Sequence, residues 1–221
     1  GAPYRFCRTP AAGGAGSSGP VTALGVFTGI QVACEHVLGE ASMKRRKALV
    51  QGAGSVGGIL IEHLLNAGAE VLFSEVDDML IQRFKDELGL QFIPVEKTSK
   101  TECDVFAPCA FGGVLNENTI PQLKCRIVAG GANNQLAHPE DAGRLRAKGI
   151  LYAPDYVVNV GGAMAIPGIE TLGWSQADAE EKVVKSVRYG LQRIFEIANA
   201  EGITTDEAAH RIAEQRLSKE V

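Results

Sequence analysis

A short apolar run passes directly into a glycine-rich turn at residues 48–57, ALVQGAGSVG. The first four residues read as a buried strand, and a helix-like pattern begins at once over residues 56–67. In a Gly-x-Gly-x-x-Gly turn of this kind, the first glycine allows a tight turn and the second lets a pyrophosphate approach the backbone. The third lets the helix pack closely on the strand. The phosphates would lie at the helix N-terminus, where free N–H groups favour anions.

The residue that ends the next strand supports a dinucleotide site. The apolar run 70–74 leads into Glu75, about 20 residues beyond the turn, where a carboxylate can accept both ribose hydroxyls of NAD. That carboxylate would repel a 2′-phosphate, and residues 76–80 contain no Arg, so NAD is favoured over NADP. The alternative is a structural turn beside a surface glutamate. The shared order of strand, turn, helix and acid favours the cofactor site.

Strand-like and helix-like runs alternate along most of the chain. Strands are expected at 48–51, 70–74, 104–107, 126–129 and 150–153, and helices at 20–39, 56–67, 77–88, 118–123, 139–148, 175–200 and 205–217. This alternation predicts an α/β fold of Rossmann type, with a doubly wound, mostly parallel sheet, helices on both faces and C-terminal helices. Residues 1–19, rich in Gly, Ala, Ser and Pro, are expected to be a linker, and residues 20–202 the NAD-binding domain.

Composition excludes several classes of function. The 221 residues include 22 Lys and Arg against 26 Asp and Glu, a formal charge of −4, so neither nucleic acid nor an anionic membrane is expected as a partner. No apolar run is expected to approach the roughly 20 residues of a membrane span. The five cysteines form no Cys-x-x-Cys pair, which argues against a disulfide framework or a metal site and favours a cytoplasmic location.

Four further motifs surround the glycine turn. They are PVTALGV at residues 20–26, DVFAPCA at 104–110, GGANNQ at 130–135 and YAPDYVVNVGG at 152–162. In this order, the chain from about residue 16 onward resembles the cofactor-binding half of the glutamate/leucine/phenylalanine/valine dehydrogenase family, and its leucine enzymes above all. The resemblance implies reversible oxidative deamination of an L-amino acid to a 2-oxo acid and ammonia, with hydride transfer to NAD.

The resemblance also assigns cofactor contacts. Thr22 would bond the nicotinamide carboxamide, and Glu75 would hold the adenosine ribose, where the leucine enzymes carry Asp. Asn133 would lie on the nicotinamide side, and Asn159 would support the loop beside it. The remaining cofactor contacts would come from the glycine turn and from the chain after the strand at 104–107: Gly52, Gly54, Ser55, Val56, Gly57, Cys109 and Ala110.

Three residues are implied at the amino-acid substrate. Asn134 would touch it, and Ala163 and Ile166 would line its side-chain pocket. The leucine enzymes usually carry Val at the position of Ala163, so a roomier pocket is expected, for a leucine-type, branched-chain or aromatic substrate. Simpler alternatives stay open, since Asn133 and Asn134 can cap their loop through local bonds. Cys109 can be a small buried hydrophobe, and the glycines at 161–162 can be turn residues.

The catalytic groups are expected elsewhere. In the family, the catalytic lysines and aspartate lie in a separate N-terminal domain, and its Gly-Gly-Gly-Lys type stretch has no counterpart in these residues. We therefore expect no catalytic residue and no activity in this chain alone, and a homo-oligomer at full length. The helix within residues 203–221 would pack on the missing domain and would lack a partner here. The alternative function is a non-catalytic NAD-binding regulatory module.

Overall fold

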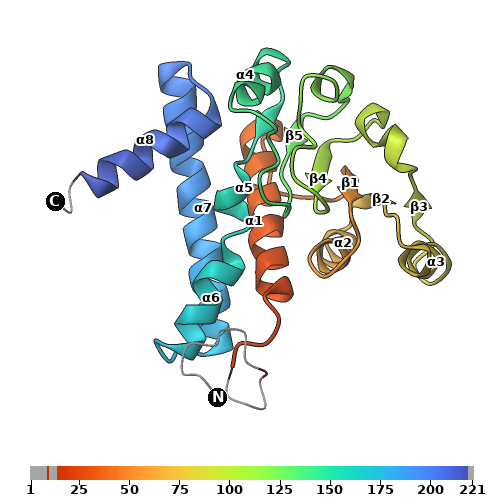
Figure 1. Cartoon of the computed structure of the whole chain (residues 1–221), viewed down its shortest axis with the longest axis horizontal. Helices are drawn as coiled ribbons and strands as arrows, with labels where there is room; N and C mark the ends of the chain where they lie inside the picture. The colour runs from red at the N-terminus through yellow and green to blue at the C-terminus, as the bar shows by residue number, and fades with distance from the viewer. Residues whose placement is uncertain (1–8, 10–13, 219–221) are drawn as a thin grey trace.

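The structure, a computed structural model, describes residue 9 and residues 14–218. Within them a six-stranded sheet runs in the order β3-β2-β1-β4-β5-β6, and Figure 1 labels the first five of these strands in that order. Every pair of neighbouring strands is parallel. This is the strand order of a doubly wound dinucleotide-binding sheet. The fold class predicted from the sequence is confirmed.

The elements follow the predicted alternation closely. The strands are β1 (Lys47–Gln51), β2 (Glu70–Ser74), β3 (Gln91–Phe92), β4 (Val105–Pro108), β5 (Ile127–Val128) and β6 (Leu151–Tyr152). The helices are α1 (Gly19–Leu38), α2 (Gly57–Asn66), α3 (Asp78–Asp86), α4 (Glu140–Ala147), α5 (Asp155–Val158), α6 (Gly161–Glu170), α7 (Gln176–Glu201) and α8 (Thr205–Leu217). Within the described residues there are also two 3₁₀ turns, η2 (Val95–Lys100) and η3 (Ile120–Gln122).

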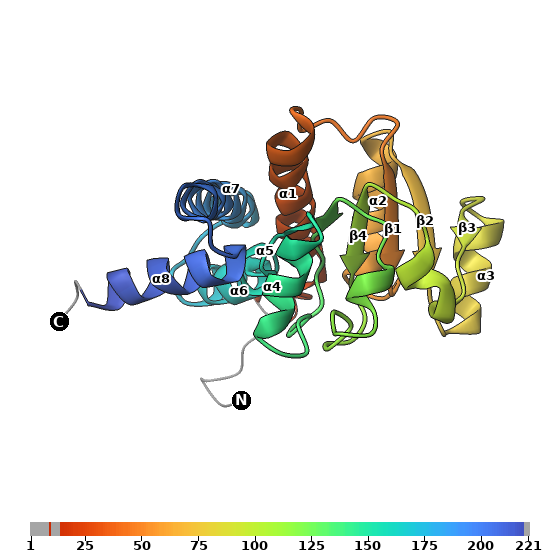
Figure 2. The same ribbon diagram turned by 90° about the horizontal axis from the view of Figure 1, so that it is seen from above.

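Both faces of the sheet are covered, which explains why its strands read as continuous apolar runs. Successive strand side chains point to opposite faces. Val50 and Phe73 therefore join the core formed with α1, α2 and α7, whereas Leu49 and Phe106 join a second core. The second core includes side chains of η3 and α4. Helices α1 and α7 lie side by side in both views, beyond the β4 side of the central strands (Figures 1 and 2).

Three segments differ from the prediction. Strand β3 was missed because it is only two residues long and ends before Pro94. The helix expected at 118–123 is only the 3₁₀ turn η3, because Pro121 lies in its first turn. The segment 154–168, for which no helix or strand is predicted, holds α5 and most of α6, with Pro167 inside α6. The segment 1–19 lies largely outside the described residues.

Helix α1 corrects the expectation that no segment is apolar enough for a membrane span. By length and composition alone, its 20 residues pass that test. In the fold, however, Val26, Ile30 and Ala33 are fully buried in the core shared with α2 and α7. The apolar character of α1 is accounted for by its position in the protein interior.

Helix α8 has a partner within this chain, contrary to the expectation that its apolar face would have none. Ala208, Ala209 and Ile212 are buried, and α8 contacts both α7 and β6. Ala213 and Leu217 remain exposed on this helix, Leu217 by 68%. Figure 2 shows α8 leading away from the sheet toward the C-terminus.

We expect the described cysteines to react slowly with alkylating reagents. Burial raises the pKa of Cys34 and Cys109 to about 11, that of Cys125 to about 12, and that of Cys103 further. Because the thiolate is the reactive form, labelling of the folded chain is expected to be slow at pH 8 and to accelerate toward pH 11. Peptide mapping after pulse alkylation measures each site, with unfolded chain as the control. Rapid labelling of Cys109 at pH 8 would contradict this prediction.

The third glycine of the turn is expected to be essential for stability. A Cβ at Gly57 would lie 1.9 Å from the backbone oxygen of Gly52, so Gly57→Ala must push α2 away from β1. We expect it to lower the free energy of unfolding by about 2–3 kcal/mol. The matched control is Gly143→Ala, at an exposed position in α4 with open space around it, which is expected to gain up to about 1 kcal/mol. Urea unfolding measures both, and equal stability of the two variants would refute the packing role.

Candidate dinucleotide site

The three glycines of the turn have the three expected environments. Gly52 adopts φ +92°, and a Cβ there would lie 2.8 Å from the Cβ of Ala110. Gly57 lies against the backbone of Gly52, whereas a Cβ on Gly54 would meet nothing within 4 Å. The first and third positions are therefore closed by the protein, and the second faces open space at the N-terminus of α2. This is the arrangement that a pyrophosphate requires.

The carboxylate of Glu75 is held against the same turn. Its Oε2 accepts a hydrogen bond of 2.7 Å from the N–H of Ala53, and its Oε1 accepts one of 2.7 Å from the N–H of Val76. Beside the turn lies a hollow of about 510 Å³, lined in part by Gly54 and Ser55, a volume in the range of about 300–1,000 Å³ typical of ligand sites. Glu75 does not line this hollow, but Ala53, to which it is bonded, does.

The ends of β4 and β5 close in on the turn from the other side. The N–H of Gly131 lies 3.4 Å from the Sγ of Cys109, and a Cβ at Gly131 would lie 2.8 Å from the Cγ1 of Val56. Ala110 is exposed next to Gly52. Because burial raises the pKa of Cys109 to about 11, its side chain is a neutral thiol at pH 7.

The two asparagine motifs meet across the loop after β5. The Nδ2 of Asn159 donates a hydrogen bond of 2.7 Å to the Oδ1 of Asn133, 26 residues earlier in the chain. The side chain of Asn133 therefore contacts a distant segment and not just its own loop. Asn134 adopts φ +53°, and its N–H bonds Asp155. The N–H of Gly162 donates a 3.1 Å bond to the Oγ1 of Thr22. These contacts bring Asn133 to Asn159, and Thr22 to Gly162.

Gly161 and Gly162 do more than form a turn. A Cβ at Gly161 would lie 2.3 Å from the backbone oxygen of Val21, and one at Gly162 would lie 2.8 Å from the Cβ of Ser18. Both glycines therefore let α6 pack closely against the start of α1. Ala163, the next residue, is exposed. Ile166 lies about one turn further along α6 and is half-buried.

Two residues with clear contacts had no assigned role in the sequence analysis. Asp155 and Tyr152 are both buried, and their side chains bond each other. The available signal was an aspartate two residues after the strand at 150–153, a position where a carboxylate is normally solvated. Sequence alone did not reveal that this aspartate turns inward.

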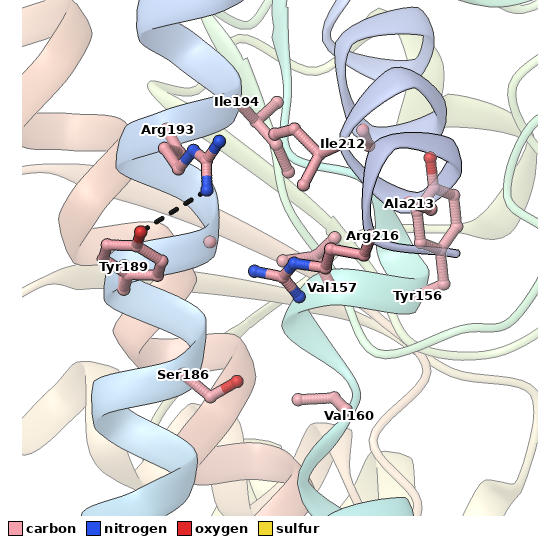
Figure 3. A pocket seen from close by; sticks show the side chains of 12 residues that line it. Tyr156, Val157, Val160, Ser186, Tyr189, Arg193, Ile194, Ile212, Ala213 and Arg216 are labelled. Atoms are coloured by element: carbon pink, nitrogen blue, oxygen red, sulfur yellow. Dashed lines mark hydrogen bonds between the residues drawn. The ribbon is translucent and has the colours of Figure 1, made fainter. Parts of the chain in front are cut away.

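A separate groove lies between α5, α7 and α8 (Figure 3). It has a volume of about 260 Å³, below the usual range of ligand sites, and none of the predicted site residues lines it. Arg193 bonds the hydroxyl of Tyr189 at its wall, at 3.4 Å. Among the residues that the structure describes, no group of three or more His, Cys, Asp or Glu side chains is placed to hold a metal ion.

Comparisons with known proteins agree with this geometry. The model of the glutamate/leucine/phenylalanine/valine dehydrogenase family matches residues 72–221. The chain is 40% identical over 209 residues to leucine dehydrogenase of Thermoactinomyces intermedius, covering 95% of this chain and 57% of that protein. It is 42% identical over 214 residues to valine dehydrogenase of Streptomyces virginiae, covering 96% of this chain and 59% of that protein.

A solved structure is similar as well. The crystal structure of L-tryptophan dehydrogenase from Nostoc punctiforme superposes with a TM-score of 0.88 at 39% identity, covering 93% of this chain and 62% of that one. The chain thus spans about three fifths of the length of each of these relatives. With its parallel sheet, its glycine turn and these amino-acid dehydrogenase relatives, the chain belongs to the glutamate/leucine/phenylalanine/valine dehydrogenase family.

Proposed function

We propose that this chain is the NAD-binding half of an L-amino-acid dehydrogenase, which interconverts an L-amino acid with its 2-oxo acid and ammonia. The observation that supports it best is the turn at β1, where Gly54 faces open space and Glu75 is bonded to Ala53. A carboxylate at the end of β2 suits ribose hydroxyls and repels a 2′-phosphate, which favours NAD over NADP.

The site residues divide between the two ends of the cofactor. Thr22, Asn133 and Asn159 would hold the nicotinamide end, and Glu75 the adenosine ribose. When bound, NAD supplies the hydride acceptor of the reaction. The pyrophosphate and the middle of the cofactor would rest on the turn and on the end of β4, through Gly52, Gly54, Ser55, Val56, Gly57, Cys109 and Ala110.

The amino-acid substrate would approach beside the nicotinamide end. Asn134 would touch it, and Ala163 with Ile166 would line the pocket for its side chain. Ala163 is small and exposed, which leaves room for a large side chain. The relatives act on leucine, valine and tryptophan by their names, so the proposal covers branched-chain and aromatic amino acids.

The rest of the catalytic machinery would lie in chain beyond these residues. The chain covers 57% of the leucine dehydrogenase of Thermoactinomyces intermedius, and we propose that a further N-terminal domain carries the catalytic lysines and aspartate. In the complete enzyme, residues 20–202 would form the NAD-binding domain after a linker at 1–19. Residues 203–221 would carry the helix that packs on the second domain. We propose a homo-oligomer in the cytoplasm.

Replacement of Glu75 tests the cofactor assignment. Glu75→Ala removes the acceptor for the ribose hydroxyls, and we expect NAD to bind about tenfold more weakly, the loss of one charge-assisted hydrogen bond. Discrimination against NADP is expected to fall in the same variant, because the repelling charge is gone. Isothermal calorimetry with both cofactors measures the effect, and Asp78→Ala, which removes an exposed acid from α3, is the control. Equal binding of NADP and NAD by the unmutated chain would refute the role of Glu75.

An activity assay tests the division between the two halves. We expect no amino-acid-dependent formation of NADH by this chain, because cofactor binding alone leaves water activation and proton transfer unassisted. The absorbance of NADH is followed with a panel of L-amino acids, and a full-length relative serves as the positive control. Turnover at an ordinary enzymatic rate would show that the catalytic groups reside in these 221 residues.

A further inference from the structure

We propose that Asp155 is a positioning residue that fixes the loop of residues 130–135 so that Asn133 presents its side chain to the nicotinamide end of the cofactor. The proposal rests on the proposed function, because it takes that end to lie at Asn133 and Asn159. Asp155 touches neither cofactor nor substrate in this assignment. It acts through Asn134, the neighbour of Asn133 in the chain.

The contacts of Asp155 use both of its carboxylate oxygens. Oδ2 accepts a hydrogen bond of 2.6 Å from the N–H of Asn134, and Oδ1 accepts one of 2.8 Å from the hydroxyl of Tyr152. The N–H of Asp155 lies 3.2 Å from the same hydroxyl. Asp155 is only 6% exposed and Tyr152 only 2%. The carboxylate is therefore held in one orientation inside the protein.

A buried carboxylate needs strong donors to offset the loss of its hydration. Among the residues that the structure describes, no ion pair of Asp155 is found, so its donors are the phenol and the backbone N–H. Burial, together with the adjacent carboxylate, raises the pKa of Tyr152, which keeps the phenol protonated as a donor. With only these donors to replace its hydration, the buried carboxylate of Asp155 costs folding free energy. Its two hydrogen bonds join it to the loop and to the end of β6.

The loop needs such a bond at this point. Asn134 adopts φ +53°, a left-handed conformation that is unfavourable for most side chains and that asparagine adopts with the help of local hydrogen bonds. The acceptor on Asp155 holds the Asn134 N–H in the direction that this conformation requires. Since Asn133 precedes it, the same bond sets where the Asn133 side chain lies, 2.7 Å from the Nδ2 of Asn159.

The base of the loop is secured by a different residue. The buried side chain of Gln135 donates hydrogen bonds of 2.7 Å to the oxygen of Gly130 and 3.0 Å to that of Ala132. These bonds tie both ends of the loop together without involving Asn133 or Asn134. Loss of Asp155 is therefore expected to disturb the two asparagines while the loop stays attached to β5.

Two ligands and two substitutions test the proposal. NADH carries the nicotinamide, whereas ADP-ribose carries only the adenosine, pyrophosphate and second ribose. In Asp155→Ala we expect NADH to bind about tenfold more weakly and ADP-ribose to bind unchanged. In Asp155→Asn, the amide oxygen can accept from Asn134 and the amide NH₂ can donate to the Tyr152 hydroxyl, so binding of both ligands is expected to be close to that of the unmutated chain. Calorimetry on the 221-residue chain gives the four comparisons.

A second measurement does not depend on any ligand. Hydrogen exchange of the Asn134 amide is expected to accelerate in Asp155→Ala and to stay slow in Asp155→Asn, while the amides of β1 and α2 keep their protection in both. Retained ADP-ribose binding and retained protection in β1 together show that Asp155→Ala is folded.

Each outcome decides the proposal. Selective loss of NADH binding in Asp155→Ala, restored in Asp155→Asn, supports it. Equal weakening of NADH and ADP-ribose would show a general structural role and overturn it, as would unchanged NADH binding. If the unmutated chain binds NADH no more tightly than ADP-ribose, the positioning role is refuted, whereas the proposed dinucleotide site is supported. If it binds neither ligand, the proposed function itself fails, and the positioning role fails with it.

Discussion

The close approach of α2 to the end of β1 governs the geometry of the edge of the sheet that carries the candidate site. The backbone oxygen of Gly52 occupies the space in which any side chain at position 57 would begin. With no Cβ at that point, the first turn of α2 reaches the sheet, and its free N–H groups open beside Gly54. Gly52 is in turn confined by Ala110 at the end of β4. One backbone contact therefore aligns β1, α2 and β4, the elements that flank the point where the strand order reverses.

A second set of close contacts brings the other end of the site into place. Gly25 and Gly29 lie one turn apart on the same face of α1. A Cβ at either would lie within 2.7 Å of an atom of Val158 in α5. This face lets α5 and α6 approach α1, so that Thr22 reaches the N–H of Gly162. Many of the glycines are therefore explained by close packing: of α2 on β1, and of α5 and α6 on α1.

The sequence predicted the elements whose signals are local. These are the glycine turn, the buried strands and the amphipathic helices, whose residues themselves determine where each element begins and ends. In α7, for example, Ser175 and Asp178 form the capping box at the start, and Gly202 ends the helix. The family motifs likewise named the asparagines that the structure brings together. Contacts between distant segments were beyond reach, because nothing in the residues around Asp155 indicates that its carboxylate points to Asn134. The two-residue strand β3 was equally hidden, since pairing with β2 alone defines it.

Tyr152 connects the last helix to the loop of residues 130–135. Its backbone oxygen accepts a hydrogen bond of 2.7 Å from the Oγ1 of Thr205 at the start of α8, and its hydroxyl bonds Asp155. In the next residue of α5, the hydroxyl of Tyr156 bonds the carboxylate of Asp206 at 3.0 Å. Movement of α8 relative to α5 would have to stretch these bonds. Because each of these residues is tied to the end of β6 or to α5, the position of α8 and the conformation of the loop depend on the same short segment of chain.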